Sequence, residues 1–177
     1  MAISIEQIKE LRGITQAGTM DCKKALEEAD GDIKRAVEII REKGVIKAAQ
    51  KADRVAAQGC IGSYVHNGRI GAMVEVNCET DFVAHNEGFQ ELARNIAMQI
   101  AAMAPEYINP ESVPAERKET LEADEIVDLL SQPFFKDPSL TIKDLIIDCV
   151  AKYKENIKVS RFVRYEVGKE NFINANN

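Results

Sequence analysis

Apolar residues recur at intervals of three and four through residues 1–44, the spacing of side chains on one face of a helix. This spacing predicts three short amphipathic helices. Ser4 and Gln7 have the spacing of a capping box that begins the first helix, and Gly13 can end it. The turn ADGD precedes the third helix, which we expect to end at Gly44. Residues 1–44 are therefore predicted to form a compact three-helix domain.

The alanine-rich stretch VIKAAQKADRVAAQ, residues 45–58, has high intrinsic helix propensity and few apolar side chains to bury. We expect it to be a helical connector.

Beyond residue 58 the apolar period changes to two, which is typical of strands. CIGSYVH and RIGAMVEVNC flank Asn67-Gly68, a strong signal for a two-residue hairpin turn. Near the C-terminus, NIKVSRFVRYEV alternates in the same way and predicts a third strand with Val159, Val163 and Val167 on one face. The edges of a small antiparallel sheet invite pairing with another chain, so we expect a dimer or a bound partner.

Two longer helices are expected to cover this sheet. Residues 87–104 carry an apolar stripe that ends before Pro105, and Thr141 with Asp144 caps a second amphipathic helix. The fold class is therefore α+β, with a core and dimerisation domain over residues 59–168.

The remaining segments have weaker patterns. Residues 105–125 contain three prolines and many charges, which predicts a mobile connection, and a short helix is expected around 124–130. Residues 169–177, KENFINANN, are expected to be a flexible tail.

Composition narrows the classes of partner. Charged residues make up 29% of the chain and hydrophobic residues 45%, as in ordinary globular proteins. The net charge of −6 argues against direct binding of nucleic acid, and no apolar run has membrane-spanning length. The start MAISIEQIKE resembles neither a signal nor a transit peptide, so we expect a cytoplasmic protein.

Signatures of catalysis are missing from the sequence. It contains no P-loop, dinucleotide glycine pattern, nucleophile elbow or HExxH motif, so we expect a binding protein and not an enzyme. Cys60, His66, Cys78 and His85 form an imaginable zinc set, but their spacings lack the close pairs of structural zinc sites. We predict no metal and no other cofactor. Basic residues between Lys47 and Arg54 leave an RNA-binding protein as an alternative.

The stretch CETDFVAHN, residues 78–86, lies at a predicted corner between a strand and a helix. Thr80 is expected to cap this corner, with Asp81 and Phe82 following it. Phe82 has two interpretations. Its ring either folds back onto the helix stripe at Phe89 and Leu92, or it points outward and binds a partner.

Several long motifs resemble the translation elongation factor Ts family. They are LRGITQAGTMDCKKALEEADGDIKRAVEIIREKG, RVAAQGCIGSYVHNGRIGAMVEVNCETDFVAHNEGFQELARNIAMQIAAM, QPFFKDPSLTIKDL and RFVRYEVG, in the order of the family. The first resembles the family's ubiquitin-associated-like domain, and the TDFV stretch is the family's most telling motif. Together these motifs cover most of the chain.

The resemblance implies a guanine-nucleotide exchange factor that binds elongation factor Tu in its GDP-bound and nucleotide-free forms. It implies that Thr80, Asp81, Phe82 and Val83 act to dislodge the magnesium ion bound to that partner. It also places three positions of the N-terminal domain near the partner: Arg12, Thr19 and Met20. Thr19 departs from the methionine that is usual in the family, so this position offers less apolar contact.

Two further departures concern the core. The chain has one core module where longer members have two, and between Pro105 and Glu125 it lacks a helical stretch that members carry. Short members complete the core by homodimerisation, so the resemblance also implies a homodimer. An interaction adaptor, which would bind a partner without affecting nucleotide release, is the main alternative.

Overall fold

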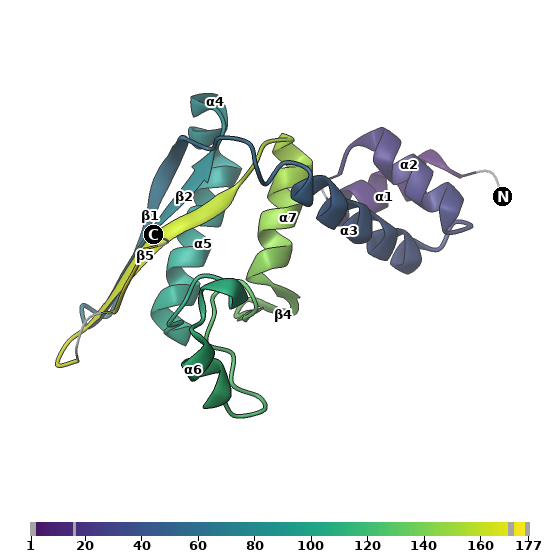
Figure 1. The fold of residues 1–177 in the computed structure, drawn as a ribbon. Coiled ribbons are helices and arrows are strands. Elements are labelled where there is room, and N and C mark those ends of the chain that lie inside the picture. Colours follow the sequence, from purple (N-terminus) through teal and green to yellow (C-terminus); the bar gives the residue numbers. More distant parts are fainter. Residues whose placement is uncertain (1–2, 16, 170–171, 176–177) are drawn as a thin grey trace. The chain divides into compact units, whose positions relative to one another are not determined.

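The computed structural model describes residues 3–15, 17–169 and 172–175 (Figure 1). The chain forms two compact units, each built from two segments: Met1–Arg54 with Ile146–Asn156, and Val55–Leu145 with Ile157–Asn177. The described residues include no helix that is long and apolar enough to cross a membrane.

The first unit begins with three helices, α1 (Ile5–Thr15), α2 (Thr19–Glu28) and α3 (Ile33–Ala49). The predicted capping box is confirmed, because the backbone N–H of Ser4 donates to Gln7 Oε1 (3.0 Å) and that of Gln7 donates to Ser4 Oγ (3.1 Å). The helices enclose one apolar core made of Leu11, Ala17, Cys22, Ala25, Leu26, Ala29, Ala36, Ile39 and Ile40.

The third helix is longer than predicted. It passes through Gly44 and continues to Ala49, so only the first part of the expected connector is helical. Gly44 is buried, and a Cβ added there would lie 2.9 Å from Ile147 Cγ2. The glycine therefore allows close packing and does not end the helix. In the same way α1 runs through Gly13 to Thr15.

Helix α7 (Ile142–Tyr153), with the predicted Thr141–Asp144 cap, begins in the second unit and ends in the first. Asn156 follows this helix and is buried. Its side-chain amide donates to the carbonyls of Ala52 (3.1 Å) and Arg54 (2.8 Å), which joins the two segments of the first unit.

The second unit is built on an antiparallel sheet with the strand order β1-β2-β5-β6. Its strands are β1 (Gln58–His66), β2 (Ile70–Cys78), β5 (Lys158–Glu166) and β6 (Phe172–Ala175). The predicted hairpin turn is confirmed, since φ is 49° at Asn67 and 66° at Gly68. Strand β6 lies in the stretch expected to be a flexible tail, so the sheet has four strands where three were predicted.

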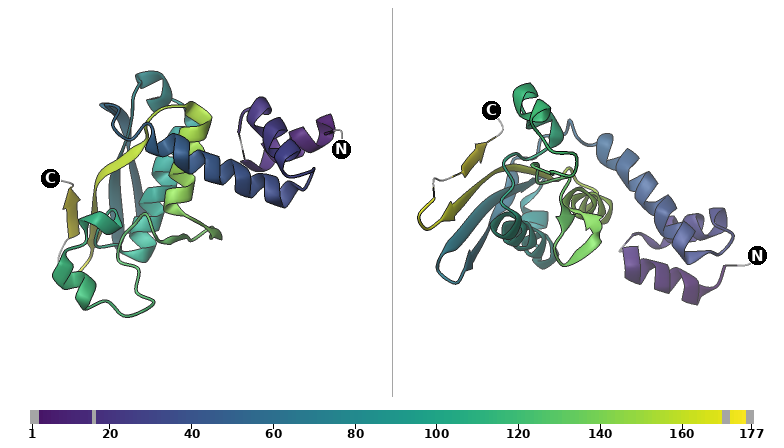
Figure 2. Two further views of the ribbon diagram at one scale, coloured as in Figure 1. Left: turned by 45° about the vertical axis from the view of Figure 1, so that its right-hand side comes forward. Right: turned by 90° about the horizontal axis from the view of Figure 1, so that it is seen from below.

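Helix α5 (Glu87–Met103) covers one face of the sheet, as predicted (Figure 2). Asn86 begins the helix by accepting a hydrogen bond from the Gly88 N–H (3.0 Å). The expected apolar stripe is buried from Phe89 to Ile100. The architecture is thus α+β, as the sequence predicts.

A β-bulge changes the face pattern of β5. Val76 pairs with Val159 while Glu75 pairs with Arg161, so Ser160 is an extra residue in the strand. The prediction that Val159, Val163 and Val167 lie on one face is therefore wrong. Beyond the bulge Phe162 is buried, and Val167 is exposed.

Residues 105–130 are folded differently from the prediction. A short 3-10 helix η1 (Pro110–Ser112) and helix α6 (Ala115–Glu119) lie within the expected mobile connection. The guanidinium of Arg117 donates to Glu106 and Glu125, which ties the two ends of this segment together. The helix predicted around residues 124–130 is wrong, because the backbone there pairs with residues 107–108 instead. A small hairpin of β3 (Pro133–Phe134) and β4 (Asp137–Thr141) follows.

Candidate partner-binding site

The TDFV corner forms a single helical turn, α4 (Asp81–Ala84), directly after strand β2 (Figure 1). Thr80 has extended backbone angles, and its Oγ1 accepts a hydrogen bond from the Val83 N–H (3.4 Å). The cap predicted for Thr80 is therefore confirmed.

The two sides of this turn differ in burial. Val83 and Ala84 are buried and anchor the turn near β1 and β2. Phe82 points the other way, and 80% of its surface is exposed. The interpretation that Phe82 folds onto the stripe at Phe89 and Leu92 is thus wrong, because those two residues are buried without it.

A hollow of about 420 Å³ lies beside the exposed ring, lined by Asp81, Phe82, His85 and Asn86. Asp81 is exposed in the first turn of α4, so a carboxylate and an aromatic ring are presented together. Such a pair can combine apolar burial with charge-assisted hydrogen bonding, which suits the recognition of a protein surface.

The candidate residues of the first unit are also accessible. Arg12 is exposed on α1, Thr19 is the first residue of α2, and Met20 is 63% exposed. Ile14, which is 57% exposed, was not identified from the sequence. Ile14 follows Leu11 by three residues, which is also the spacing of buried helix positions, so the sequence carried no signal for its exposure. The structure thus brings Thr80–Val83 together in one turn of the second unit, whereas the other candidates belong to α1 and α2.

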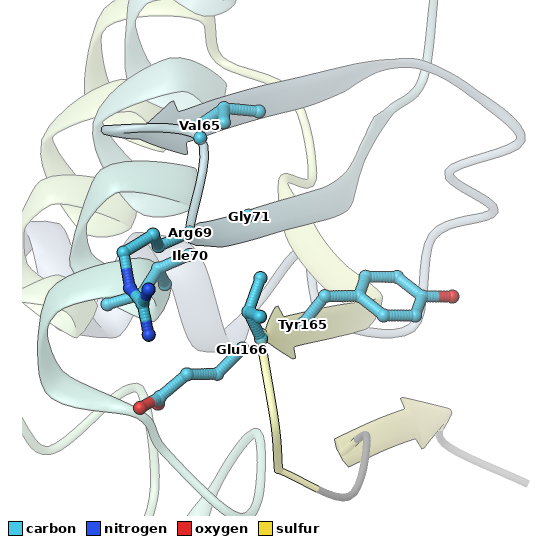
Figure 3. A pocket seen from close by; sticks show the side chains of 8 residues that line it. Val65, Arg69, Ile70, Gly71, Tyr165 and Glu166 are labelled. Carbon is cyan, nitrogen blue, oxygen red and sulfur yellow. The ribbon is translucent and has the colours of Figure 1, made fainter.

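The outer face of the sheet, away from α5, is a second apolar surface. Its exposed side chains are Ile61, Val65, Met73 and Tyr165. Val65, Gly71 and Tyr165 lie opposite one another on three neighbouring strands (Figure 3). They contribute to a hollow of about 410 Å³ at the hairpin end of the sheet.

The basic residues of the connector are engaged in intramolecular contacts. Lys47 Nζ lies 3.2 Å from Asp21 Oδ1, Lys43 pairs with Glu28, and Lys51 Nζ donates to the Lys47 carbonyl (3.3 Å). Acidic partners offset the charges of Lys47 and of Lys43, which lies just before the connector, and this weakens the connector as a surface for phosphates.

The imagined zinc residues do not converge. Cys78 is buried at one end of β2, whereas His66 is exposed at the hairpin turn, where its Nδ1 lies 3.0 Å from the Tyr64 hydroxyl. Among the described residues, no three His, Cys, Asp or Glu side chains are grouped so that they could hold a metal ion. Burial raises the pKa of the Cys60 thiol, which opposes the thiolate form that binds zinc.

Comparison with known proteins decides the family. A family model described as Elongation factor TS matches residues 3–128. This chain belongs to the elongation factor Ts family. Elongation factor Ts of Carboxydothermus hydrogenoformans is 47% identical over 195 aligned positions, which cover 94% of this chain and 90% of the relative.

Two further members of the elongation factor Ts family give the same result. The protein of Thermodesulfovibrio yellowstonii is 48% identical, with 96% of this chain and 98% of the relative covered. That of Thermotoga neapolitana is 48% identical, with 96% and 100% covered. Each of these alignments is longer than the 177 residues of this chain, so the relatives carry residues for which this chain has no counterpart.

Proposed function

We propose that this chain is a nucleotide exchange factor for elongation factor Tu. It acts during the elongation phase of protein synthesis in the cytoplasm, and it binds both the GDP-bound and the nucleotide-free partner. It is not an enzyme, because its site changes a binding equilibrium and carries out no covalent chemistry. The observation that carries the proposal is the 80% exposure of Phe82 on a corner whose other side is buried.

Nucleotide exchange depends on the linkage between two binding events on the GTPase, that of the nucleotide and that of the exchange factor. A magnesium ion bridges the GDP phosphates and the GTPase, so a conformation without good metal contacts holds the nucleotide weakly. A factor that binds this conformation preferentially lowers nucleotide affinity, and the nucleotide lowers the affinity of the factor by the same ratio. A coupling of about 1–3 kcal/mol changes affinity roughly 5- to 150-fold, so strong exchange needs several contacts acting together.

Phe82 and Asp81 suit this role. The ring of Phe82 has only two rotatable bonds to order, and burying it in a slot of the partner contributes roughly 1.5–3 kcal/mol. The Asp81 carboxylate can accept hydrogen bonds from the partner's backbone near the metal site. Thr80 and Val83 hold these two side chains outward and in this way serve to dislodge the magnesium ion.

The N-terminal helices supply a second contact with elongation factor Tu. Met20 offers an exposed apolar side chain and Arg12 an exposed charge, and both lie in the unit that resembles the family's docking domain. Thr19 adds little apolar surface, and we propose that this chain docks more weakly there than members with methionine.

We also propose that two copies associate through the outer face of the sheet. Ile61, Val65, Met73 and Tyr165 are each 49–67% exposed there, which is unusual for a face that stays in water. A two-fold axis places the same patch against itself, so apolar side chains meet apolar side chains. On the same face Arg161 Nε lies 2.6 Å from Glu75 Oε2, and this pair can exchange partners across the axis.

The test is release of a fluorescent GDP analogue from elongation factor Tu in the presence of excess unlabelled nucleotide. We expect this chain to accelerate release strongly and Phe82→Ala to lose most of the acceleration while its melting temperature stays unchanged. Val55→Ala is the matched control, because it removes another apolar side chain that is 81% exposed in the same unit. Binding to elongation factor Tu without faster release would favour an adaptor instead.

A further inference from the structure

Two side chains secure consecutive carbonyls at the base of the TDFV corner. The Thr80 carbonyl accepts a helical hydrogen bond from the Ala84 N–H (3.2 Å) and a second one from the Cys78 thiol (3.1 Å). The Asp81 carbonyl accepts from the backbone N–H of His85 (3.0 Å) and also from its imidazole Nδ1 (2.7 Å). Each of the two carbonyls therefore accepts one hydrogen bond from a backbone N–H of the turn and one from a side chain.

The direction of the hydrogen bond between the His85 imidazole and the Asp81 carbonyl follows from their chemistry. A carbonyl oxygen only accepts, so Nδ1 of His85 must carry the proton in this contact. Both the neutral Nδ1–H tautomer and the imidazolium can donate this bond. Cys78, in contrast, is fully buried beneath the corner, and its thiol is the donor to the Thr80 carbonyl.

The corner needs such support because it is short. Helix α4 has four residues, well below the length at which a helix is stable by itself. Phe82, with 80% of its surface exposed, contributes little to holding the turn in place. The buried Val83 and Ala84, the Thr80 cap and the two side-chain bonds therefore contribute to its order.

We propose that His85 and Cys78 are positioning residues, which hold the corner in the conformation that inserts into the partner. This inference rests on the proposed exchange function. A corner that is already ordered loses little conformational entropy on insertion, whereas a loosened one must be ordered at that moment. The loss should appear in the maximal rate of GDP release more than in the concentration of factor that gives half of this rate, because the N-terminal helices still dock.

A pair of variants tests the role of His85. In His85→Asn the side-chain amide nitrogen takes about the place of Nδ1 and can still donate to the Asp81 carbonyl, whereas in His85→Gln the amide lies one bond further out, near the place of Nε2. We expect His85→Gln to lower the maximal rate of GDP release roughly three- to tenfold and His85→Asn to stay within about twofold of the parent. Cys78→Ser keeps a donor and Cys78→Ala removes it, so we expect the same order for that pair.

The second readout needs no partner. Hydrogen exchange of the backbone amides of residues 84 and 85 in the free chain should accelerate in His85→Gln and not in His85→Asn. If the parent fails to accelerate GDP release, the proposed function fails, and this exchange measurement still tests the positioning role. Equal amide exchange in all three proteins would overturn the inference. Equal losses of GDP release in both variants would also overturn it, because the imidazole would then act by direct contact with the partner.

Discussion

Gly62 of β1 lies directly against the backbone of Ala93 in α5, so that a Cβ added at Gly62 would clash with the Ala93 carbonyl. The helix can approach the sheet this closely only because position 62 has no side chain. We predict that Gly62→Ala lowers the free energy of unfolding by roughly 3 kcal/mol, since a backbone group cannot move aside as a side chain can. Chemical denaturation measures this change. Gly71→Ala, where the nearest neighbour of a Cβ would be the Val65 side chain 3.8 Å away, should change it by less than about 1 kcal/mol.

Asp81 is predicted to act on nucleotide release more than on docking. Asp81→Ala should slow GDP release from elongation factor Tu roughly tenfold while weakening the complex with the nucleotide-free partner only two- to threefold, because one charge-assisted hydrogen bond contributes about 1.5–3 kcal/mol where it is made. Stopped-flow release and calorimetry measure the two effects. Asp81→Asn keeps the shape and removes the charge, so it should resemble the alanine variant. Equal losses in rate and affinity would make Asp81 a docking residue.

The proposed contact through α1 and α2 can be tested with one variant that should weaken binding to elongation factor Tu and one that should strengthen it. Met20→Ala should weaken binding to elongation factor Tu roughly 5- to 30-fold, because it removes about 1–2 kcal/mol of apolar contact from a side chain that is 63% exposed in the free chain. Thr19→Met should strengthen binding, since it restores the apolar side chain usual in the family. Surface plasmon resonance can compare the three proteins. Affinity that is unchanged in both variants would place the contact elsewhere on the first unit.

Association through the outer face of the sheet can be tested by adding charge. Met73 is 49% exposed at the centre of this face, and Met73→Lys would bring two ammonium groups together across a two-fold axis. We expect sedimentation equilibrium to report a dimer for the parent and a monomer for this variant. Gln90→Lys adds the same charge at an exposed position of α5 and should remain a dimer. A dimer that survives Met73→Lys would exclude this face as the interface.

Cys149 gives a prediction for alkaline conditions. Burial raises the pKa of its thiol from an ordinary 9.0 to about 12. Below pH 9 the thiol is protonated in both states, whereas between pH 9 and 12 only the unfolded chain loses the proton, so stability falls as the pH rises. The loss is about 1.4 kcal/mol for each pH unit above 9. Cys149→Ser cannot titrate there, so its stability relative to the parent should increase by about 2 kcal/mol between pH 8 and 10.5. Parallel denaturation profiles of the two proteins would contradict this.

Local patterns in the sequence predicted much of the fold. The Ser4–Gln7 capping box, the Asn67-Gly68 turn and the stripe of α5 were predictable because each depends on residues a few positions apart. The Thr80 cap was predictable for the same reason. The exposure of Phe82 was not, because an aromatic residue near an apolar stripe is equally consistent with a core position until the direction of the turn is known.

The errors arose where distant residues decide the structure. Gly44 resembles a helix end, but a neighbouring side chain at Ile147 requires a glycine inside a longer helix. The bulge at Ser160 depends on pairing with β2, more than 80 residues earlier in the chain, and it reverses the alternation that Val163 and Val167 suggest. Strand β6 likewise depends on the edge that β5 offers, because Phe172 and Ile173 favour strands but form too short a run to predict one.

The division of the first unit between two distant segments has a consequence for biosynthesis. The core of α1, α2 and α3 lies between Leu11 and Ile40, so it can close soon after this part of the chain leaves the ribosome. The carbonyls of Ala52 and Arg54, however, can accept hydrogen bonds from the Asn156 side chain only after that residue has been synthesised. During most of translation the end of α3 therefore lacks the segment that packs against it, and residues 146–177 then complete both units at nearly the same moment.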